Sequence, residues 1–108
     1  MVFDMRCLPN PHWQPALREL TGLDAPVRDF LTGQADVERM FATVSQFLET
    51  WLPSFAHSDR SQLTVGIGCT GGRHRSVYMA ERLAHHFVAQ QASTQHGRVQ
   101  LRHRQLSG

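Results

Sequence analysis

The chain has 108 residues and a mass of 12.3 kDa, so we predict one domain and exclude a second. No apolar run reaches the roughly 18 residues that span a membrane, so no membrane partner is expected. Two cysteines, Cys7 and Cys69, are too few for a disulfide framework, so we expect a reducing, cytoplasmic setting. The net charge of +2 is uneven, because residues 1–59 carry 4 arginines and 8 acidic residues whereas residues 60–108 carry 7 arginines and 1 acidic residue, which points to an anionic partner on the second half.

The first half of the chain is predicted to contain one strand and two helices. Residues 2–8 form a strand-like run that two prolines then interrupt. A short helix is expected between Asp24, a candidate N-terminal cap, and Gly33, which closes it. The longest helix follows, and Pro53 is expected to end it. Its apolar residues recur at helical spacing and are interpreted as core: Val37, Met40, Phe41, Val44, Phe47, Leu48, Trp51 and Leu52.

The second half is predicted to contain two more strands with a helix between them. Large and small side chains alternate over residues 63–68, apolar residues recur at helical spacing over residues 77–87, and residues 98–104 form a further strand-like run. Strands joined by helices favour an α/β fold with a small, mostly parallel sheet of three to four strands and flanking helices. Ligand loops are then expected at the carboxyl ends of the strands.

The glycine loop, residues 68–76, lies between the second strand and the last helix and reads Gly68-Cys69-Thr70-Gly71-Gly72-Arg73-His74-Arg75-Ser76. Unpaired amides and the positive end of the macrodipole at a helix start attract phosphate or carboxylate. Arginine and hydroxyl side chains add charge and direction. The loop after the first strand should approach this one. The predicted ligand-binding residues are therefore His12, Thr70, Gly71, Gly72, Arg73, His74, Arg75 and Ser76.

Several of these residues have a second interpretation. His12 binds the ligand or only caps a turn, and Trp13 is a lid or a core aromatic residue. Arg102 and Arg104 share one face of the last predicted strand, and this face either contacts an anion or RNA or is simply exposed. All eleven cations are arginine, which suits bidentate phosphate contact but is equally explained by a GC-rich genome.

The glycine loop also matches Cys-x-x-Gly-x-x-Arg-Ser, the pattern of cysteine-dependent phosphatases. In that interpretation Cys69 is the nucleophile and Arg75 chelates the phosphate. Such enzymes also need an aspartate to protonate the leaving group, and no acid loop is recognisable. Cys69 is more often a small buried apolar residue. A non-enzyme without catalytic residues is therefore the prediction, with a phosphatase as the alternative. The chain lacks lysine and paired zinc-ligand spacing, so neither an ATPase nor a metal site is expected.

The chain closely resembles, nearly end to end, the C-terminal domain of the RapZ family of RNase adaptors and nucleotide-binding proteins. The motifs that carry the resemblance are residues 4–13, residues 21–27, residues 67–78 and Arg102-His103-Arg104. The resemblance implies that the full-length protein has an N-terminal P-loop domain, absent from this chain, on which the nucleotide would bind. It also implies a homo-oligomer, and a domain that binds glucosamine-6-phosphate and presents a small regulatory RNA to an endoribonuclease, thereby regulating amino-sugar synthesis.

The same resemblance assigns roles to particular residues. The sugar phosphate would contact His12 with Thr70, Gly71, Gly72 and Arg75, and the RNA-binding residues would be Arg73, Arg102 and Arg104. Position 73 is arginine where familiar relatives have lysine, which keeps the charge. Enterobacterial relatives end in a basic tail that contributes to RNA binding, whereas this chain ends Gln105-Leu106-Ser107-Gly108. No other cofactor is expected on this domain.

Overall fold

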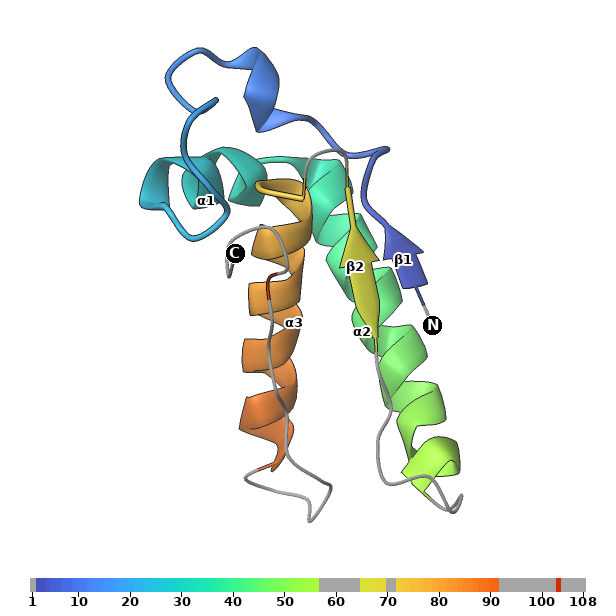
Figure 1. The fold of residues 1–108 in the computed structure, drawn as a ribbon. Coiled ribbons are helices and arrows are strands. Elements are labelled where there is room, and N and C mark those ends of the chain that lie inside the picture. Colours follow the sequence, from blue (N-terminus) through green and yellow to red (C-terminus); the bar gives the residue numbers. More distant parts are fainter. Residues whose placement is uncertain (1, 57–64, 70–71, 92–102, 104–108) are drawn as a thin grey trace.

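The computed structural model describes residues 2–56, 65–69, 72–91 and 103 (Figure 1). Its elements in chain order are β1 (Val2–Asp4), the 3-10 helix η1 (Pro11–Trp13), α1 (Ala25–Thr32), α2 (Ala35–Ala56), β2 (Gly66–Gly68) and α3 (Arg75–Gln91). The predicted α/β class is confirmed. The described sheet has two strands rather than three to four. The further strand predicted over residues 98–104 lies outside the described residues, apart from His103.

The sheet consists of β1 and β2, which run parallel and pair Val2 with Gly66 and Asp4 with Gly68. The amide of Met5 extends the pairing by donating to the Gly68 carbonyl at 2.7 Å. The chain then turns, because the Leu8 amide donates back to the Met5 carbonyl at 3.1 Å. β1 is therefore shorter than the strand predicted over residues 2–8, and the two strands end side by side.

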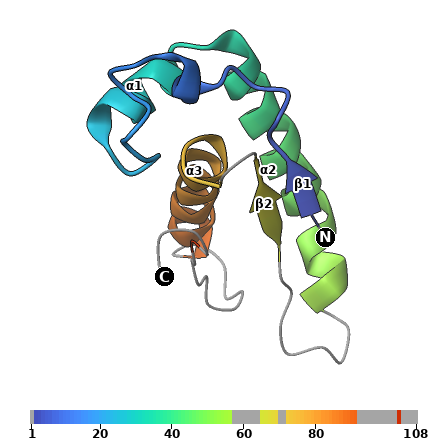
Figure 2. The ribbon, with the colours of Figure 1, turned by 45° about the horizontal axis from the view of Figure 1, so that its top comes forward.

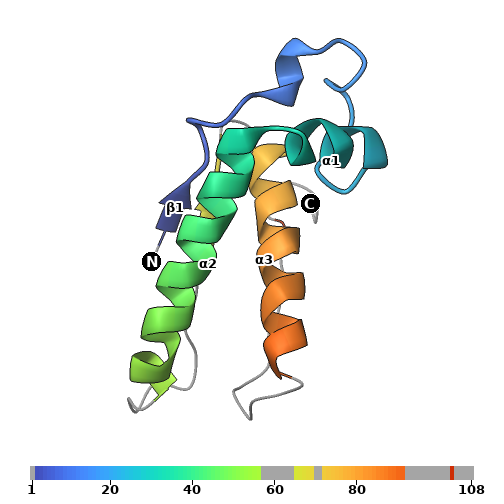
Figure 3. The same ribbon diagram turned by 180° about the vertical axis from the view of Figure 1, so that it is seen from behind.

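The three helices pack against one another and against the sheet. Figure 3 shows α2 and α3 side by side, with α1 crossing near the start of each, and all three pairs are in contact. Figure 1 shows β1 and β2 in front of α2, with the carboxyl ends of both strands toward the start of α3. In the described ranges, no helix has the length and apolar character to cross a bilayer.

α1 confirms the short helix predicted between Asp24 and Gly33. Asp24 stands at the N-cap position with an extended backbone, and Gly33 is the C-terminal cap. The Asp24 carboxylate does not cap the helix amides, however, but accepts from the Thr21 amide at 2.8 Å. It therefore fixes the turn before α1 rather than the helix end.

α2 corrects two predictions. Pro53 lies within the helix, which continues to Ala56. A proline there removes one backbone hydrogen bond and crowds the carbonyl four residues earlier, so it weakens the last turn without ending the helix. Trp51 is not a core residue, since 49% of its surface is exposed, and Phe47 is 43% exposed. Phe47 instead packs edge-on against Phe3. The described residues therefore cover only part of the apolar face of α2, and Phe47 and Trp51 lie on the part left exposed.

The hydrophobic core lies between the helices and the sheet. Its buried members come from every helix and from the loops after β1: Met5, Leu8, Leu17, Val27, Leu31, Val37, Val44, Leu48, Tyr78, Met79 and Leu83. Trp13, in contrast, is 74% exposed, so its interpretation as a core residue is wrong.

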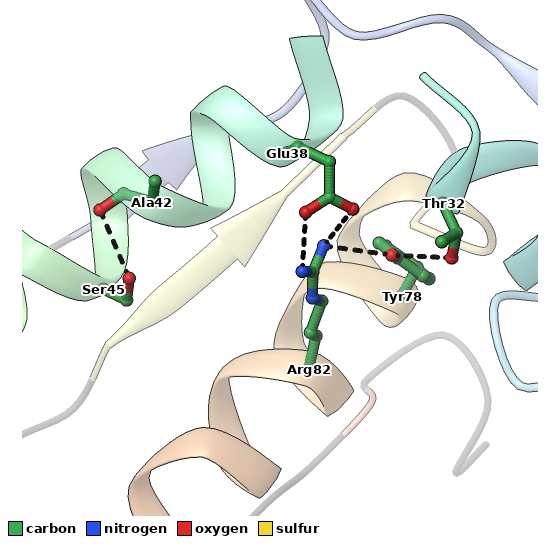
Figure 4. A network of polar contacts seen from close by, with 6 residues as sticks. All are labelled: Thr32, Glu38, Ala42, Ser45, Tyr78 and Arg82. Atoms are coloured by element: carbon green, nitrogen blue, oxygen red, sulfur yellow. Dashed lines mark hydrogen bonds and ion pairs between the residues drawn. The ribbon is translucent and has the colours of Figure 1, made fainter. Parts of the chain in front are cut away.

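A polar network joins the three helices beside this core (Figure 4). Arg82 on α3 makes a two-pronged ion pair with Glu38 on α2, with both N···O distances at 2.7 Å. Arg82 also donates to the Tyr78 hydroxyl, which lies 3.0 Å from the Thr32 hydroxyl at the end of α1. This network fixes the direction in which α3 leaves the glycine loop.

Gly22 brings the turn at residues 21–24 against the start of α3. Its amide donates to the Arg73 carbonyl at 2.8 Å. A Cβ atom at this position would lie 2.5 Å from both the His74 carbonyl oxygen and the Tyr78 amide nitrogen. Only glycine permits this approach, so the turn and the glycine loop are positioned together.

Candidate functional site

The candidate site lies where the carboxyl ends of β1 and β2 meet the start of α3. Figure 2 views α3 obliquely with its first turn toward the viewer, with β2 on one side and the chain from β1 to α1 arching past that turn. The segment after β1 and the glycine loop therefore meet at one edge, as expected for parallel strands. Thr70 and Gly71 of the predicted site lie outside the described residues, as do Arg102 and Arg104.

Arg75 is the first residue of α3 and is buried, with 4% of its surface exposed. Its Nη1 donates to the carbonyl oxygens of Arg6 at 2.8 Å and Leu8 at 3.1 Å. These bonds join the helix start to the segment that follows β1. Arg75 makes no ion pair with any described residue.

The other edge of the Arg75 guanidinium has different surroundings. Its Nε is buried and has no hydrogen-bond partner. The Nη2 group lies on the same edge of the planar fork, and no described residue accepts a hydrogen bond from it. Leaving a buried donor unpaired costs about 1–3 kcal/mol, and more where the group is charged. An oxyanion that takes both N–H groups of this edge would remove that cost.

Cys69 and Ser76 lie beside each other at the same helix start. The Cys69 thiol donates to the Ser76 hydroxyl oxygen at 3.2 Å, and the Ser76 amide donates to the same sulfur at 3.3 Å. When the thiol loses its proton, the Ser76 hydroxyl can turn and donate to the thiolate instead. One of the unpaired amides that the sequence offered to a ligand is therefore occupied by the sulfur. Sulfur is a weak acceptor, so a stronger acceptor can replace it.

The surroundings of Cys69 change its acidity. Burial alone raises the pKa of the thiol, but hydrogen bonds from the Ser76 hydroxyl and amide and from the Gly72 amide, together with the charge of Arg75, outweigh it. The pKa of Cys69 therefore lies below its usual value. Gly72 reaches its position with φ of 65°, a left-handed conformation that favours glycine. The helix start thus stabilises negative charge on sulfur.

Arg73 and His74 face the turn before α1. The Arg73 guanidinium donates to the Glu19 carbonyl at 3.1 Å and is exposed. His74 is buried, and its Nε2 lies 3.1 Å from the Leu17 carbonyl, so this nitrogen carries the proton and donates. Both side chains hold the loop over residues 17–22 in place.

His12 lies on η1 and is exposed. Its backbone amide donates to Oδ1 of the capping residue Asn10 at 3.0 Å, and its ring meets the Trp13 ring edge-on. The structure brings Cys69, Gly72, Arg75 and Ser76 together, but it does not place the His12 imidazole in contact with them.

A surface cavity of about 400 Å³ opens beside Cys69, lined by Val2, Phe3, Asp4, Arg6, Gly68 and Cys69. A Cβ atom built on Gly68 would meet nothing within 4 Å, so the space next to this strand end is open. Asp4 is the one carboxylate in this lining, and its side chain pairs with Arg6 at 2.7 Å. Hydrogen bonds from Arg6 hold the pKa of Asp4 below its usual value, so Asp4 is ionised at neutral pH.

Sequence reasoning missed two parts of this site. The carbonyl groups that hold Arg75 belong to a segment almost 70 positions away in the chain, and no side-chain pattern marks them. The Cys-x-x-Gly-x-x-Arg-Ser spacing indicates an enzyme motif but does not by itself predict the contact between Cys69 and Ser76. In the described ranges, no group of three or more histidine, cysteine or carboxylate side chains is placed to hold a metal ion.

Comparison with known proteins identifies the family. The model of the family described as "RapZ C-terminal domain" matches residues 1–107. A nucleotide-binding protein of Pseudomonas syringae pv. tomato is 56% identical over 107 residues, which is 99% of this chain and 36% of that protein. Nucleotide-binding proteins of Pseudomonas fluorescens SBW25 and Pseudomonas putida GB-1 are 55% and 56% identical, with coverage of 99% and 98% of this chain and 36% of each relative.

These relatives are named for nucleotide binding and not for an enzymatic activity. The chain spans about a third of their length, since the match covers 36% of each. On the family match over residues 1–107, the chain belongs to the RapZ C-terminal domain family.

Proposed function

We propose that this domain is a non-catalytic sensor that binds the phosphate of an amino-sugar phosphate, glucosamine-6-phosphate, at the start of α3. The observation that carries the proposal is the buried Arg75 Nε without a hydrogen-bond partner. The Arg75 edge formed by Nε and Nη2 matches two oxygens of a phosphate. We call this edge, with Cys69, Gly72 and Ser76, the anion site.

The surroundings of the anion site favour a dianion over a neutral ligand. The 17-residue helix α3 contributes the positive end of its dipole, and its first turn carries no acidic residue. The lowered pKa of Cys69 supports the same field, because charge that stabilises a thiolate also stabilises phosphate. The sugar is assigned from the family, and His12 is its proposed contact.

The relatives are named for nucleotide binding, and the nucleotide needs a site other than the anion site. We propose that it binds to the part of the full-length proteins that this chain does not span, on a P-loop domain. The metabolite would then adjust how the full-length cytoplasmic protein, as a homo-oligomer, presents a small regulatory RNA to an endoribonuclease.

Thermal unfolding tests the anion site with three ligands: glucosamine-6-phosphate, glucosamine and inorganic phosphate. A ligand at a hundredfold excess over its Kd stabilises the fold by about 2.7 kcal/mol. For a domain of this size that corresponds to a rise in Tm of roughly 10 °C. We expect this shift with the sugar phosphate, a smaller one with phosphate and none with glucosamine.

Arg75→Lys is the test variant, because lysine keeps a donor for the backbone carbonyls but has no second edge. It should lose most of the shift, whereas Arg39→Lys on the exposed side of α2 should keep it. Absence of a shift with all three ligands, or an equal shift in Arg75→Lys, would overturn the proposal.

RNA binding is the second part of the proposal, supported by the excess of 7 arginines over 1 acidic residue in residues 60–108. Arg73 is exposed there, and the family resemblance adds Arg102 and Arg104, which lie outside the described residues, as RNA-binding residues. Binding by such a surface should weaken steeply between 50 and 200 mM salt. Binding of structured RNA that does not respond to salt, or no binding, would remove this part for the isolated domain.

The alternative activity is phosphate-ester hydrolysis, which the contact between Cys69 and Ser76 favours. Asp4, the carboxylate that lines the same cavity as Cys69, is held ionised by Arg6 and cannot protonate a leaving group. We therefore expect no turnover of phosphate esters by the parent protein. Turnover that Cys69→Ser abolishes would establish the enzyme instead.

A further inference from the structure

The two cysteines of the chain have contrasting surroundings. Cys7 is exposed, and its sulfur makes no hydrogen bond to a described residue. Cys69 is partly buried at the end of β2, with its sulfur 3.3 Å from the Ser76 amide and 3.2 Å from the Ser76 hydroxyl. Donors that converge on a sulfur stabilise the thiolate, which is the reactive form of cysteine. The lowered pKa of Cys69 agrees with this geometry.

Two further observations show that Cys69 is more than a buried thiol. It is partly exposed and lines the open cavity beside β1, so solvent and small reagents can approach this residue. The buried Arg75 Nε, which has no partner, lies at the same helix start. An anion formed on the sulfur would therefore find an unpaired cationic donor next to it.

We propose that Cys69 is a modification site at which a peroxide oxidises the thiolate to a sulfenate, and that the sulfenate occupies the free edge of Arg75. The second half of this proposal rests on the anion site proposed above. Oxidation would then exclude a phosphate ligand from the domain, so that one site responds to both a metabolite and an oxidant.

The reaction balances with hydrogen peroxide alone. A sulfur lone pair of the thiolate attacks one peroxide oxygen, the S–O bond forms and the O–O bond breaks. Hydroxide leaves and takes a proton from solvent to become water, and the sulfenic acid loses its proton to give the sulfenate. Sulfur is oxidised by two electrons and the peroxide is reduced by two. The step needs no carboxylic acid, which suits a site where Asp4 is ionised.

The test compares the two cysteines in matched variants. Cys7→Ser leaves Cys69 as the single thiol, and Cys69→Ser leaves Cys7. Each protein is treated with hydrogen peroxide in the presence of dimedone, which traps sulfenic acid, and the adduct is followed by intact mass. We expect Cys69 to be trapped roughly tenfold faster than Cys7 at neutral pH, as a lowered thiol pKa implies. Equal rates, or faster trapping of Cys7, would overturn the proposal.

Ser76→Ala in the Cys7→Ser background tests the cause. Without the hydroxyl donor, the trapping rate should fall several-fold while the Tm stays close to that of the parent. An unchanged rate would show that Ser76 does not activate the sulfur and would contradict the argument.

Inorganic phosphate separates this proposal from the proposed function. Phosphate bound at the Arg75 edge should slow trapping of Cys69 and leave Cys7 unaffected. If Cys69 reacts fast but phosphate gives no protection, the shared edge is refuted while the reactive thiol stands. Phosphate binding by thermal shift together with an unreactive Cys69 would refute the modification site and leave the anion site intact.

Discussion

Replacing Gly22 with alanine tests whether the turn at residues 21–24 packs on the start of α3 as closely as the structure shows. The added Cβ atom would meet the His74 carbonyl oxygen and the Tyr78 amide nitrogen at 2.5 Å and the Val77 Cβ at 2.9 Å. Two of these three atoms belong to the backbone of the glycine loop and α3. They cannot move aside as a flexible side chain would, so the turn itself has to shift.

The cost can be estimated from the contacts. Overpacking by one methyl group in a rigid place costs about 1–3 kcal/mol. The shift would also strain the hydrogen bond from the Gly22 amide to the Arg73 carbonyl, which is worth about 1 kcal/mol. The total is about 1–4 kcal/mol. For a domain of this length each kcal/mol lowers the Tm by roughly 4–5 °C, so Gly22→Ala should lower it by about 4–20 °C.

Gly33→Ala is the matched control. Its Cβ atom would lie 3.6 Å and 3.7 Å from the nearest atoms, which is ordinary contact, and the backbone there is right-handed helical with φ of −76°. Alanine at such a position stabilises by about 0.4–1 kcal/mol through the unfolded state. Differential scanning calorimetry of the two variants should therefore give shifts of opposite sign. A Tm for Gly22→Ala within 2 °C of the parent would refute the packing of this turn.

Two further predictions concern the core and the polar network. Leu48→Ala should destabilise the domain by about 2–5 kcal/mol in urea unfolding because Leu48 is 3% exposed. Trp51→Gln, at a position that is 49% exposed, should cost less than about 1 kcal/mol. Similar losses in the two variants would contradict the described core. The ion pair with Arg82 lowers the pKa of Glu38, so its contribution is present above the usual value of 4.5 and is lost as the pH falls through the folded value. Since the two side chains are 30% and 43% exposed, Glu38→Gln should cost about 0.5–1 kcal/mol at pH 7. The cost should shrink as the pH falls through the folded value, and a loss that does not change with pH in acid would contradict this account.

The sequence predicted the helices well because their signals are local. Asp24 and Gly33 flank α1 at the positions expected of end residues, and the apolar spacing of α2 and α3 places their buried faces correctly. The end of α2 was placed too early, since proline disfavours a helix without forbidding its last turn. Trp51 was misplaced because helical spacing shows which face is apolar but not how much of it is covered.

The sheet and the site were harder to predict because they depend on distant partners. The length of β1 is set by where β2 stops pairing, and this information lies more than 60 positions away. The composition of the glycine loop predicts an anion site, as proposed above. The sequence does not predict the geometry of this loop, because Arg75 is held by the backbone carbonyls of Arg6 and Leu8, and every residue type has such a carbonyl.

A crystal structure of the domain grown with glucosamine-6-phosphate tests the central claim most directly. We predict a phosphate group whose oxygens lie about 2.7–2.9 Å from Nε and Nη2 of Arg75, while Nη1 keeps its bonds to the carbonyls of Arg6 and Leu8. A sugar phosphate bound elsewhere, or an Arg75 Nε edge filled by a protein carboxylate or carbonyl, would contradict the account.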